Sequence, residues 1–200
     1  DYITIRGIDV FSASVNMYEA SYCELVDSTL SYVSHFTKFD DGYAGYIDWW
    51  SDATTSYAGP DSAPFRGEVG IIVGGTDNVI DGCTIRYSAG AGLYLVGYRT
   101  TVTHSYIHDC GYIGTYLANI VIGGDRNHAS RPKGAHSITY NELYNGGRAL
   151  ILFELQPGTN PTYWEACDIS YNRLHDAMVL SSDGGLIYAY GSEMGDGGPR

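Results

Sequence analysis

The chain repeats one short pattern, a pair of aliphatic residues five positions apart. The six pairs are Ile3/Ile8, Leu25/Leu30, Ile80/Ile85, Val102/Ile107, Ile138/Leu143 and Ile169/Leu174. Their first members are 22, 55, 22, 36 and 31 residues apart, so two steps share one length and three are longer. Self-similarity at such a period is typical of stacked repeat proteins in which loops are inserted between equivalent units.

Each pair is accompanied by a second run that is rich in strand-forming residues. These runs are 15–18, 71–73, 93–96, 119–122, 149–155 and 186–190. No stretch between them has sustained helical spacing, so a parallel sheet made of βαβ units would lack its crossover helices. The pattern therefore predicts an all-β fold, a right-handed parallel β-helix of six or seven coils of about 22 residues, and the 55-residue step could hide an additional coil.

We expect residues 1–200 to form a single β-helix domain. A solenoid needs polar caps at its ends, and neither end of this sequence leaves room for one. We therefore expect the chain to be the middle part of a longer β-helix, whose remaining coils would be its natural partners.

Polar residues recur at the third position after the first aliphatic residue. They are Ser28, Ser105, Asn141 and Asn172, with Cys83 in one coil and Arg6 departing from the pattern in the first. Asparagine there is expected to adopt a left-handed bend and to stack its amide on the next coil. The dipeptides His108-Asp109 and His175-Asp176 also share one coil position, which favours a structural bend over an active site.

The charge balance excludes several classes of partner. With 11 basic and 23 acidic residues the net charge is −12, which disfavours nucleic acids and anionic membrane surfaces. No apolar run is long enough to insert into a membrane. The four cysteines, Cys23, Cys83, Cys110 and Cys167, are too sparse for a disulfide scaffold and are expected to fill the core.

The inserted loops, at about 37–69, 123–135 and 156–165, are expected to form the working face. The first contains Tyr46, Trp49 and Trp50 together with four aspartates, and aromatic faces beside carboxylates suit a sugar ring. A loop that folds its aromatic residues onto its own scaffold is the alternative. Trp164 of the third loop could form a wall of the same groove.

The second loop gathers three of the eleven basic residues, Arg126, Arg131 and Lys133. The forked guanidinium of arginine can bind a carboxylate through two hydrogen bonds. The loop could therefore clamp an acidic sugar, although a solvated loop explains the charges equally well.

Two carboxylates lie at similar distances from their anchors in consecutive coils. Glu154 follows Ile138 by 16 residues and Asp183 follows Ile169 by 14, and neighbouring coils are about 4.8 Å apart. Hydrolysis of glycosides usually needs such a pair. Glu154, in an apolar strand, is predicted to be the general acid, and Asp183, in a glycine-rich turn, the nucleophile or base. Structural roles in local turns are the alternative for both.

The segment 169–191, which reads ISYNRLHD and then SDGGLIYAYG, resembles secreted right-handed β-helix proteins that act on carbohydrates. In that group N-x-I-H-D coils alternate with S-D-x-G-A-I-Y strands. The resemblance implies an extracellular protein that acts on a polysaccharide or oligosaccharide, either a glycoside hydrolase or a polysaccharide lyase of pectate-lyase-like fold. The lyase would use Lys133, Arg131 or Arg126, but the calcium-binding aspartates of pectate lyases are not recognisable.

The leading prediction is therefore a glycoside hydrolase that needs no cofactor, with room for weak calcium binding on its acidic surface. The first alternative is a lyase that acts on uronic-acid polymers. The second is a non-catalytic adhesin, tailspike or filament module, in which the tyrosines and glycines serve assembly.

Overall fold

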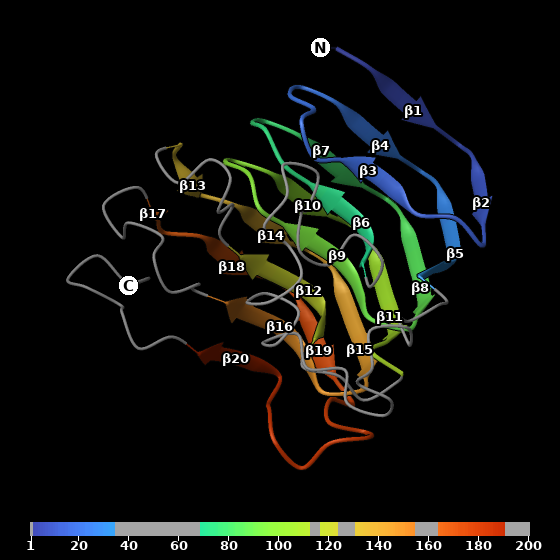
Figure 1. Cartoon of the computed structure of the whole chain (residues 1–200), viewed down its shortest axis with the longest axis vertical. Coiled ribbons are helices and arrows are strands. Elements are labelled where there is room, and N and C mark those ends of the chain that lie inside the picture. Colours follow the sequence, from blue (N-terminus) through green and yellow to red (C-terminus); the bar gives the residue numbers. More distant parts are fainter. Residues whose placement is uncertain (1, 35–68, 113–116, 124–130, 155–163, 191–200) are drawn as a thin grey trace, which may run out of the picture.

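The computed structural model describes residues 2–34, 69–112, 117–123, 131–154 and 164–190. This part of the chain contains no helix, and its strands form three parallel sheets of six strands each, which we call sheets A, B and C (Figure 1). None of the described residues belongs to a helix that could cross a membrane. The predicted right-handed parallel β-helix is confirmed.

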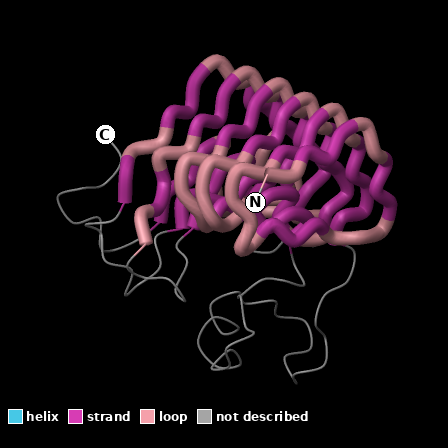
Figure 2. Tube along the Cα trace, turned by 90° about the horizontal axis from the view of Figure 1, so that it is seen from above, coloured by secondary structure: helices cyan, strands magenta, loops and turns pink. Residues whose placement is uncertain are grey.

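Every coil contributes one strand to each sheet in turn. Sheet A contains β1 (Thr4–Arg6), β4 (Glu24–Val26), β7 (Val79–Asp81), β10 (Thr101–Thr103), β14 (Ser137–Thr139) and β18 (Asp168–Ser170). Sheet B contains β2 (Asp9–Phe11), β5 (Thr29–Ser34), β8 (Thr84–Ser88), β11 (Tyr106–Cys110), β15 (Glu142–Gly146) and β19 (Arg173–His175). Sheet C contains β3 (Val15–Met17), β6 (Val69–Val73), β9 (Ala91–Leu95), β12 (Ala118–Gly123), β16 (Ala149–Glu154) and β20 (Ile187–Tyr190). Six coils result, and Figure 2 shows them stacked on one another.

Strand register corrects the repeat in the first coil. Ile5 pairs with Leu25, and Val10 pairs with Leu30, so the anchors of this coil are Ile5 and Val10 and not Ile3 and Ile8. The first step is thus 20 residues. Leu25 pairs directly with Ile80, so the 55-residue step hides no additional coil between β4 and β7.

The interior is a column of inward-pointing aliphatic side chains from all three sheets. Ile80, Val102 and Ile138 of sheet A and Ile85, Ile107 and Leu143 of sheet B are fully buried there, and they are the anchor residues of the repeat. The four cysteines are free, and Cys23, Cys83 and Cys110 are buried in the same core. Burial raises the pKa of the Cys110 thiol to about 12, which suits its role as an inert apolar side chain.

The corner between sheets A and B is the same in every coil. Two residues connect the strands, and the first of them is left-handed: Gly7, Asp27, Gly82, His104, Tyr140 and Tyr171. In four of the six coils the second residue is a serine or asparagine, Ser28, Ser105, Asn141 or Asn172, whose side chain binds the neighbouring coil. Asn141 Oδ1 accepts a hydrogen bond from the Ser105 amide at 3.0 Å, and Asn172 Oδ1 accepts one from the Asn141 amide at 2.9 Å. The expected amide stacking is confirmed, but the left-handed residue precedes the asparagine.

Sheet C differs from the other two sheets because both of its faces are apolar. Its outward residues Ile72, Tyr94, Val121 and Leu152 are buried in a second cluster outside the coil. The insertions of the sequence fall at the two corners that flank this sheet. Those between sheets C and A also contain a small additional sheet, in which β13 (Lys133–Gly134) pairs with β17 (Trp164–Glu165).

Candidate functional site

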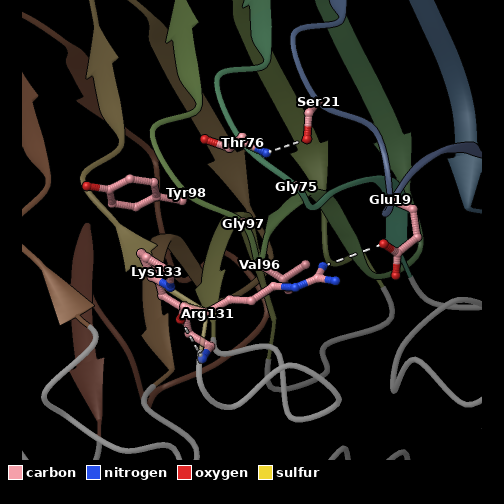
Figure 3. A pocket seen from close by; sticks show the side chains of 10 residues that line it. Glu19, Ser21, Gly75, Thr76, Val96, Gly97, Tyr98, Arg131 and Lys133 are labelled. Carbon is pink, nitrogen blue, oxygen red and sulfur yellow. Dashed lines mark hydrogen bonds and ion pairs between the residues drawn. The ribbon is translucent and has the colours of Figure 1, made fainter. Parts of the chain in front are cut away.

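A cavity of about 470 Å³ opens where the chain leaves sheet C and turns toward sheet A (Figure 3). Four consecutive crossings between these sheets line it with Glu19, Ser21, Gly75, Thr76, Val96, Gly97, Tyr98, Arg131, Pro132 and Lys133. We call it the corner pocket. Its volume lies in the range typical of small-molecule sites, roughly 300–1,000 Å³.

Glycines keep this corner hollow because the coils approach each other closely there. A Cβ atom on Gly75 would lie 1.9 Å from the carbonyl oxygen of Ala20, and one on Gly97 would lie 2.4 Å from the carbonyl oxygen of Gly75. Gly75 is also left-handed, with φ of 59°. Side chains are therefore excluded from this part of the pocket wall, and the polar groups stand around it.

Arg131 and Glu19 face each other at the mouth of the pocket (Figure 3). Arg131 Nη1 lies 3.6 Å from Glu19 Oε2, and the two side chains are 55% and 61% exposed. A solvated ion pair of this kind contributes little to stability. The guanidinium can therefore exchange Glu19 for the carboxylate of a ligand at small cost.

Lys133 stands behind Arg131 and is only 1% exposed. Its Nζ donates a hydrogen bond to the carbonyl oxygen of Arg131 at 3.3 Å. Its backbone pairs with that of Trp164 in the small sheet. Lys133 therefore fixes the segment that carries Arg131, which is a positioning role.

Tyr98 forms the opposite side of the pocket and is held from two directions (Figure 3). Its hydroxyl donates a hydrogen bond to Glu165 Oε1 at 2.6 Å, and the Arg99 guanidinium lies 4.6 Å from its ring centroid. The Glu165 carboxylate raises the pKa of the Tyr98 phenol. Arg99 is itself neutralised by Asp77 through contacts of 2.7 and 2.5 Å, and these hydrogen bonds lower the pKa of Asp77.

The structure does not bring Glu154 and Asp183 to equivalent positions. Glu154 pairs with Tyr190 at the end of sheet C, whereas Asp183 precedes β20 by four residues. Asp183 instead binds Arg148, whose side chain is 4% exposed, at 2.6 Å. Arg148 immediately precedes β16, and Glu154 is its last residue, so the two backbones are separated by six residues or about 20 Å of extended chain. The placement that suggested a catalytic pair is therefore wrong, and a structural role for Asp183 is visible.

The remaining predicted residues divide between described and undescribed parts of the chain. Tyr46, Trp49, Trp50 and Arg126 lie outside the described residues, and of Trp164 only the backbone in β17 is described. Arg131 and Lys133 line one pocket. Sequence reasoning missed Glu19, Thr76 and Tyr98, because they lie on short connections between strands and only the stacking of coils brings them together.

Among the described residues, His108, His136 and His175 make structural hydrogen bonds of the kind expected from the sequence. Asp109 and Asp176 are left-handed and accept hydrogen bonds from the imidazoles before them. His136 is buried, and its Nδ1 accepts a hydrogen bond from the Thr100 amide at 3.1 Å. Burial lowers the pKa of His136 to about 4. No group of three potential metal ligands occurs among the described residues.

A family model described as a right handed beta helix region matches residues 51–194 of the chain. This match covers 144 of the 200 residues, well over half of the sequence. Searches among curated proteins and among solved structures returned no match.

Proposed function

Because the chain belongs to the family of right-handed β-helix regions, we propose that it binds and cleaves a polysaccharide that contains uronic acids. The observation that carries this proposal is the corner pocket, where Arg131 and Lys133, predicted from sequence as a carboxylate clamp, line the same cavity. The fold alone does not determine a reaction, so the argument rests on the chemistry of this site.

The pocket offers the groups that an acidic sugar requires. The Arg131 guanidinium, held loosely by Glu19, can bind a carboxylate through two hydrogen bonds. Tyr98 provides an aromatic ring, and the side chains of Ser21 and Thr76 provide hydroxyl groups that can bind sugar hydroxyls. Lys133 adds positive charge close to Arg131 in a protein that is otherwise strongly acidic.

The reaction that this pocket supports best is β-elimination, the reaction of a polysaccharide lyase. A base removes the proton from the carbon next to the uronate carboxylate, the freed electron pair forms a carbon–carbon double bond as the neighbouring bond to the glycosidic oxygen breaks, and the departing oxygen takes up a proton from water. A cation beside the carboxylate favours the first step because it stabilises the developing negative charge. Hydrolysis by Glu154 and Asp183 is less well supported, because these residues are not in register.

The resemblance noted in the sequence also leads us to propose an extracellular location, where acidic polysaccharides are abundant. The same assay, run with and without calcium, tests the weak calcium binding that the acidic surface allows.

The test is an incubation of the protein with polygalacturonate, alginate and a neutral glucan, in which reducing ends and ultraviolet-absorbing unsaturated products are followed together. We expect both signals with an acidic polymer. We expect the Arg131→Ala variant to bind hexagalacturonate about tenfold less tightly, a loss of ~1.4 kcal/mol. Reducing ends without absorbance would replace elimination by hydrolysis, and equal binding by wild type and Arg131→Ala would remove the pocket from the mechanism.

A further inference from the structure

A second cavity lies at the corner between sheets A and B, away from the corner pocket. Its volume is about 350 Å³. Two rows of outward side chains from coils four to six border it, and the inward residues Ser105 and Asn141 lie between the rows. Because each row advances by one coil at a time, the cavity is a groove that runs along the axis of the β-helix. We call it the ladder groove.

The first row consists of the left-handed corner residues His104, Tyr140 and Tyr171. The His104 and Tyr140 rings are 5.5 Å apart and 5° from parallel, and the Tyr140 and Tyr171 rings are 5.0 Å apart and 6° from parallel. Tyr140 and Tyr171 are nevertheless 55% and 76% exposed. The row is therefore a stack of rings whose edges and hydroxyls remain in water.

The second row consists of Tyr106, Glu142 and Arg173, which occupy one register position on neighbouring strands of sheet B. Tyr106 is 52% exposed and makes no ring contact within the described part of the chain. Glu142 Oε1 accepts hydrogen bonds from Arg173 Nη1 at 2.8 Å and from His175 Nε2 at 3.0 Å. This row therefore combines the exposed ring of Tyr106 with the carboxylate of Glu142, whose negative charge is balanced by Arg173.

The base of the groove is rigid because its polar groups join the coils. The Ser105 hydroxyl accepts a hydrogen bond from the Cys83 amide at 3.0 Å, and the Asn141 side chain donates to the carbonyl oxygen of Val102 at 2.9 Å. Both residues are buried. A ligand would find the two rows already in place, so little conformational entropy would be lost on binding.

Stabilisation of the coils does not by itself explain these exposed rings. Sheet B carries a comparable stack of His108, Tyr144 and His175, with ring separations of 4.6 and 5.1 Å. There His108 is buried, and Tyr144 and His175 are partly buried. The rings of the ladder groove stack at comparable separations but keep more than half of their surface in water, and three coils in succession present them side by side, so they form a contiguous exposed patch of the kind that marks a binding site.

We propose that the ladder groove is a second carbohydrate-binding site, specific for a neutral, extended glycan that lies along the β-helix axis. Tyr106 would stack on a sugar ring, and the phenol hydroxyls and Glu142 would bind sugar hydroxyls. The acidic and basic side chains of the second row neutralise each other, so nothing in it selects for a charged ligand. One sugar unit advances an extended glycan by about one coil step. This proposal does not depend on the function proposed for the corner pocket.

The experiment is calorimetric titration of the protein with cellohexaose and xylohexaose, the two neutral probes. Binding should weaken about tenfold in Tyr106→Ser and in Tyr140→Asn, whereas Tyr140→Phe, which keeps the ring, should bind within a few-fold of wild type. Asparagine is chosen at position 140 because it tolerates the left-handed backbone. Thermal melts of each variant establish that it is folded.

Two control variants separate this site from the rest of the protein. Tyr2→Ser removes another exposed ring, which stacks on Tyr22 at 5.3 Å in the first coil, and should bind both probes as wild type does. Arg131→Ala should lose affinity for hexagalacturonate and keep its affinity for the neutral probes. The proposal is overturned if neither neutral probe binds, or if the folded Tyr106→Ser and Tyr140→Asn variants bind as tightly as wild type.

Discussion

The corner between sheets A and B has a constant length, whereas the corner between sheets C and A varies in length from coil to coil. The first is two residues long in all six coils and always begins with a left-handed residue. The second ranges from five residues between β6 and β7 to thirteen between β12 and β14. A uniform corner places equivalent side chains one coil apart and produces stacks. A variable corner interrupts the stacks and produces a pocket.

The difference also separates two kinds of polar residue. At the uniform corner the polar side chains join coil to coil, as Asn141 does. At the variable corner the coils are joined by Asn78 and His136, while Arg131 and Glu19 remain at the surface. Variants at the two corners should therefore affect different properties, stability at joining residues and ligand binding at the pocket.

The largest effect is expected from Asn141→Ala at the uniform corner. This change leaves the buried Ser105 amide and the carbonyl oxygen of Val102 without the partners that Asn141 provides. We expect the free energy of unfolding to fall by about 3 kcal/mol, measured by urea denaturation. The surface variant Asn16→Ala should change it by less than about 0.5 kcal/mol, and equal values for the two variants would contradict the comparison.

The joining role of His136 makes the variable corner sensitive to pH. The folded protein keeps this imidazole neutral down to about pH 4, whereas the unfolded chain takes up a proton near pH 6.5. Its contribution to stability is therefore complete above pH 6.5 and is lost as the pH falls toward 4. The loss should approach about 3 kcal/mol, measured by denaturation at a series of pH values.

The variant His136→Asn should abolish this pH dependence, because asparagine does not titrate and can make the same bond, as Asn78 does to the Cys23 amide two corners earlier. If the stability of His136→Asn falls between pH 6.5 and 4 as steeply as that of wild type, another group is responsible.

A smaller effect is expected from Asp183→Asn, at the corner between sheets B and C. Asp183 neutralises the buried Arg148, whose guanidinium also packs 4.6 Å from the Tyr188 ring. Because Asp183 itself is largely exposed, we expect a loss of about 1 kcal/mol. The largely exposed pair Arg6 and Asp27 provides the control, since Asp27→Asn should leave the melting temperature nearly unchanged. Lost turnover with unchanged stability in Asp183→Asn would instead restore its predicted catalytic role.

The smallest effect is expected from Glu19→Gln at the corner pocket. Removing this carboxylate frees the Arg131 guanidinium for an acidic ligand. Affinity for hexagalacturonate should rise by a few-fold at low salt, with the gain disappearing as salt screens the charges. Affinity for cellohexaose should not change, and a parallel change for both probes would show that Glu19 does not act through charge.

The repeat could be recognised in the sequence because inward-pointing positions of a β-helix accept few residue types. The anchors Ile80, Val102 and Ile138 are fully buried in the core, so their spacing was sufficient to predict the fold. The prediction was wrong in the first coil, where both Ile3/Ile8 and Ile5/Val10 fit the five-residue spacing. Only the pairing of β1 with β4 identifies Ile5 as the anchor. Distance along the chain was also a poor guide to Asp183, because the connection before β20 differs in length from the one before β16.

Only some residues of the candidate site could be predicted from the sequence. The cluster of Arg131 and Lys133 was visible as positive charge in an acidic chain, because both residues lie in one insertion. Their partners Glu19 and Tyr98 carry no local signal, since they come from connections 112 and 33 residues before Arg131. The ladder groove was missed for a related reason, because exposed tyrosines become a surface only once the coils are in register.

The sequence by itself determined that this chain coils into parallel sheets, because the alternation of buried aliphatic residues and the tight polar corners are local requirements that each coil satisfies on its own. Only the tertiary structure decided which residues of different coils face each other. That depends on strand register, which sums the lengths of all intervening loops, and a register change of one residue turns a side chain from the core to the surface. The corner pocket and the ladder groove both belong to this second level.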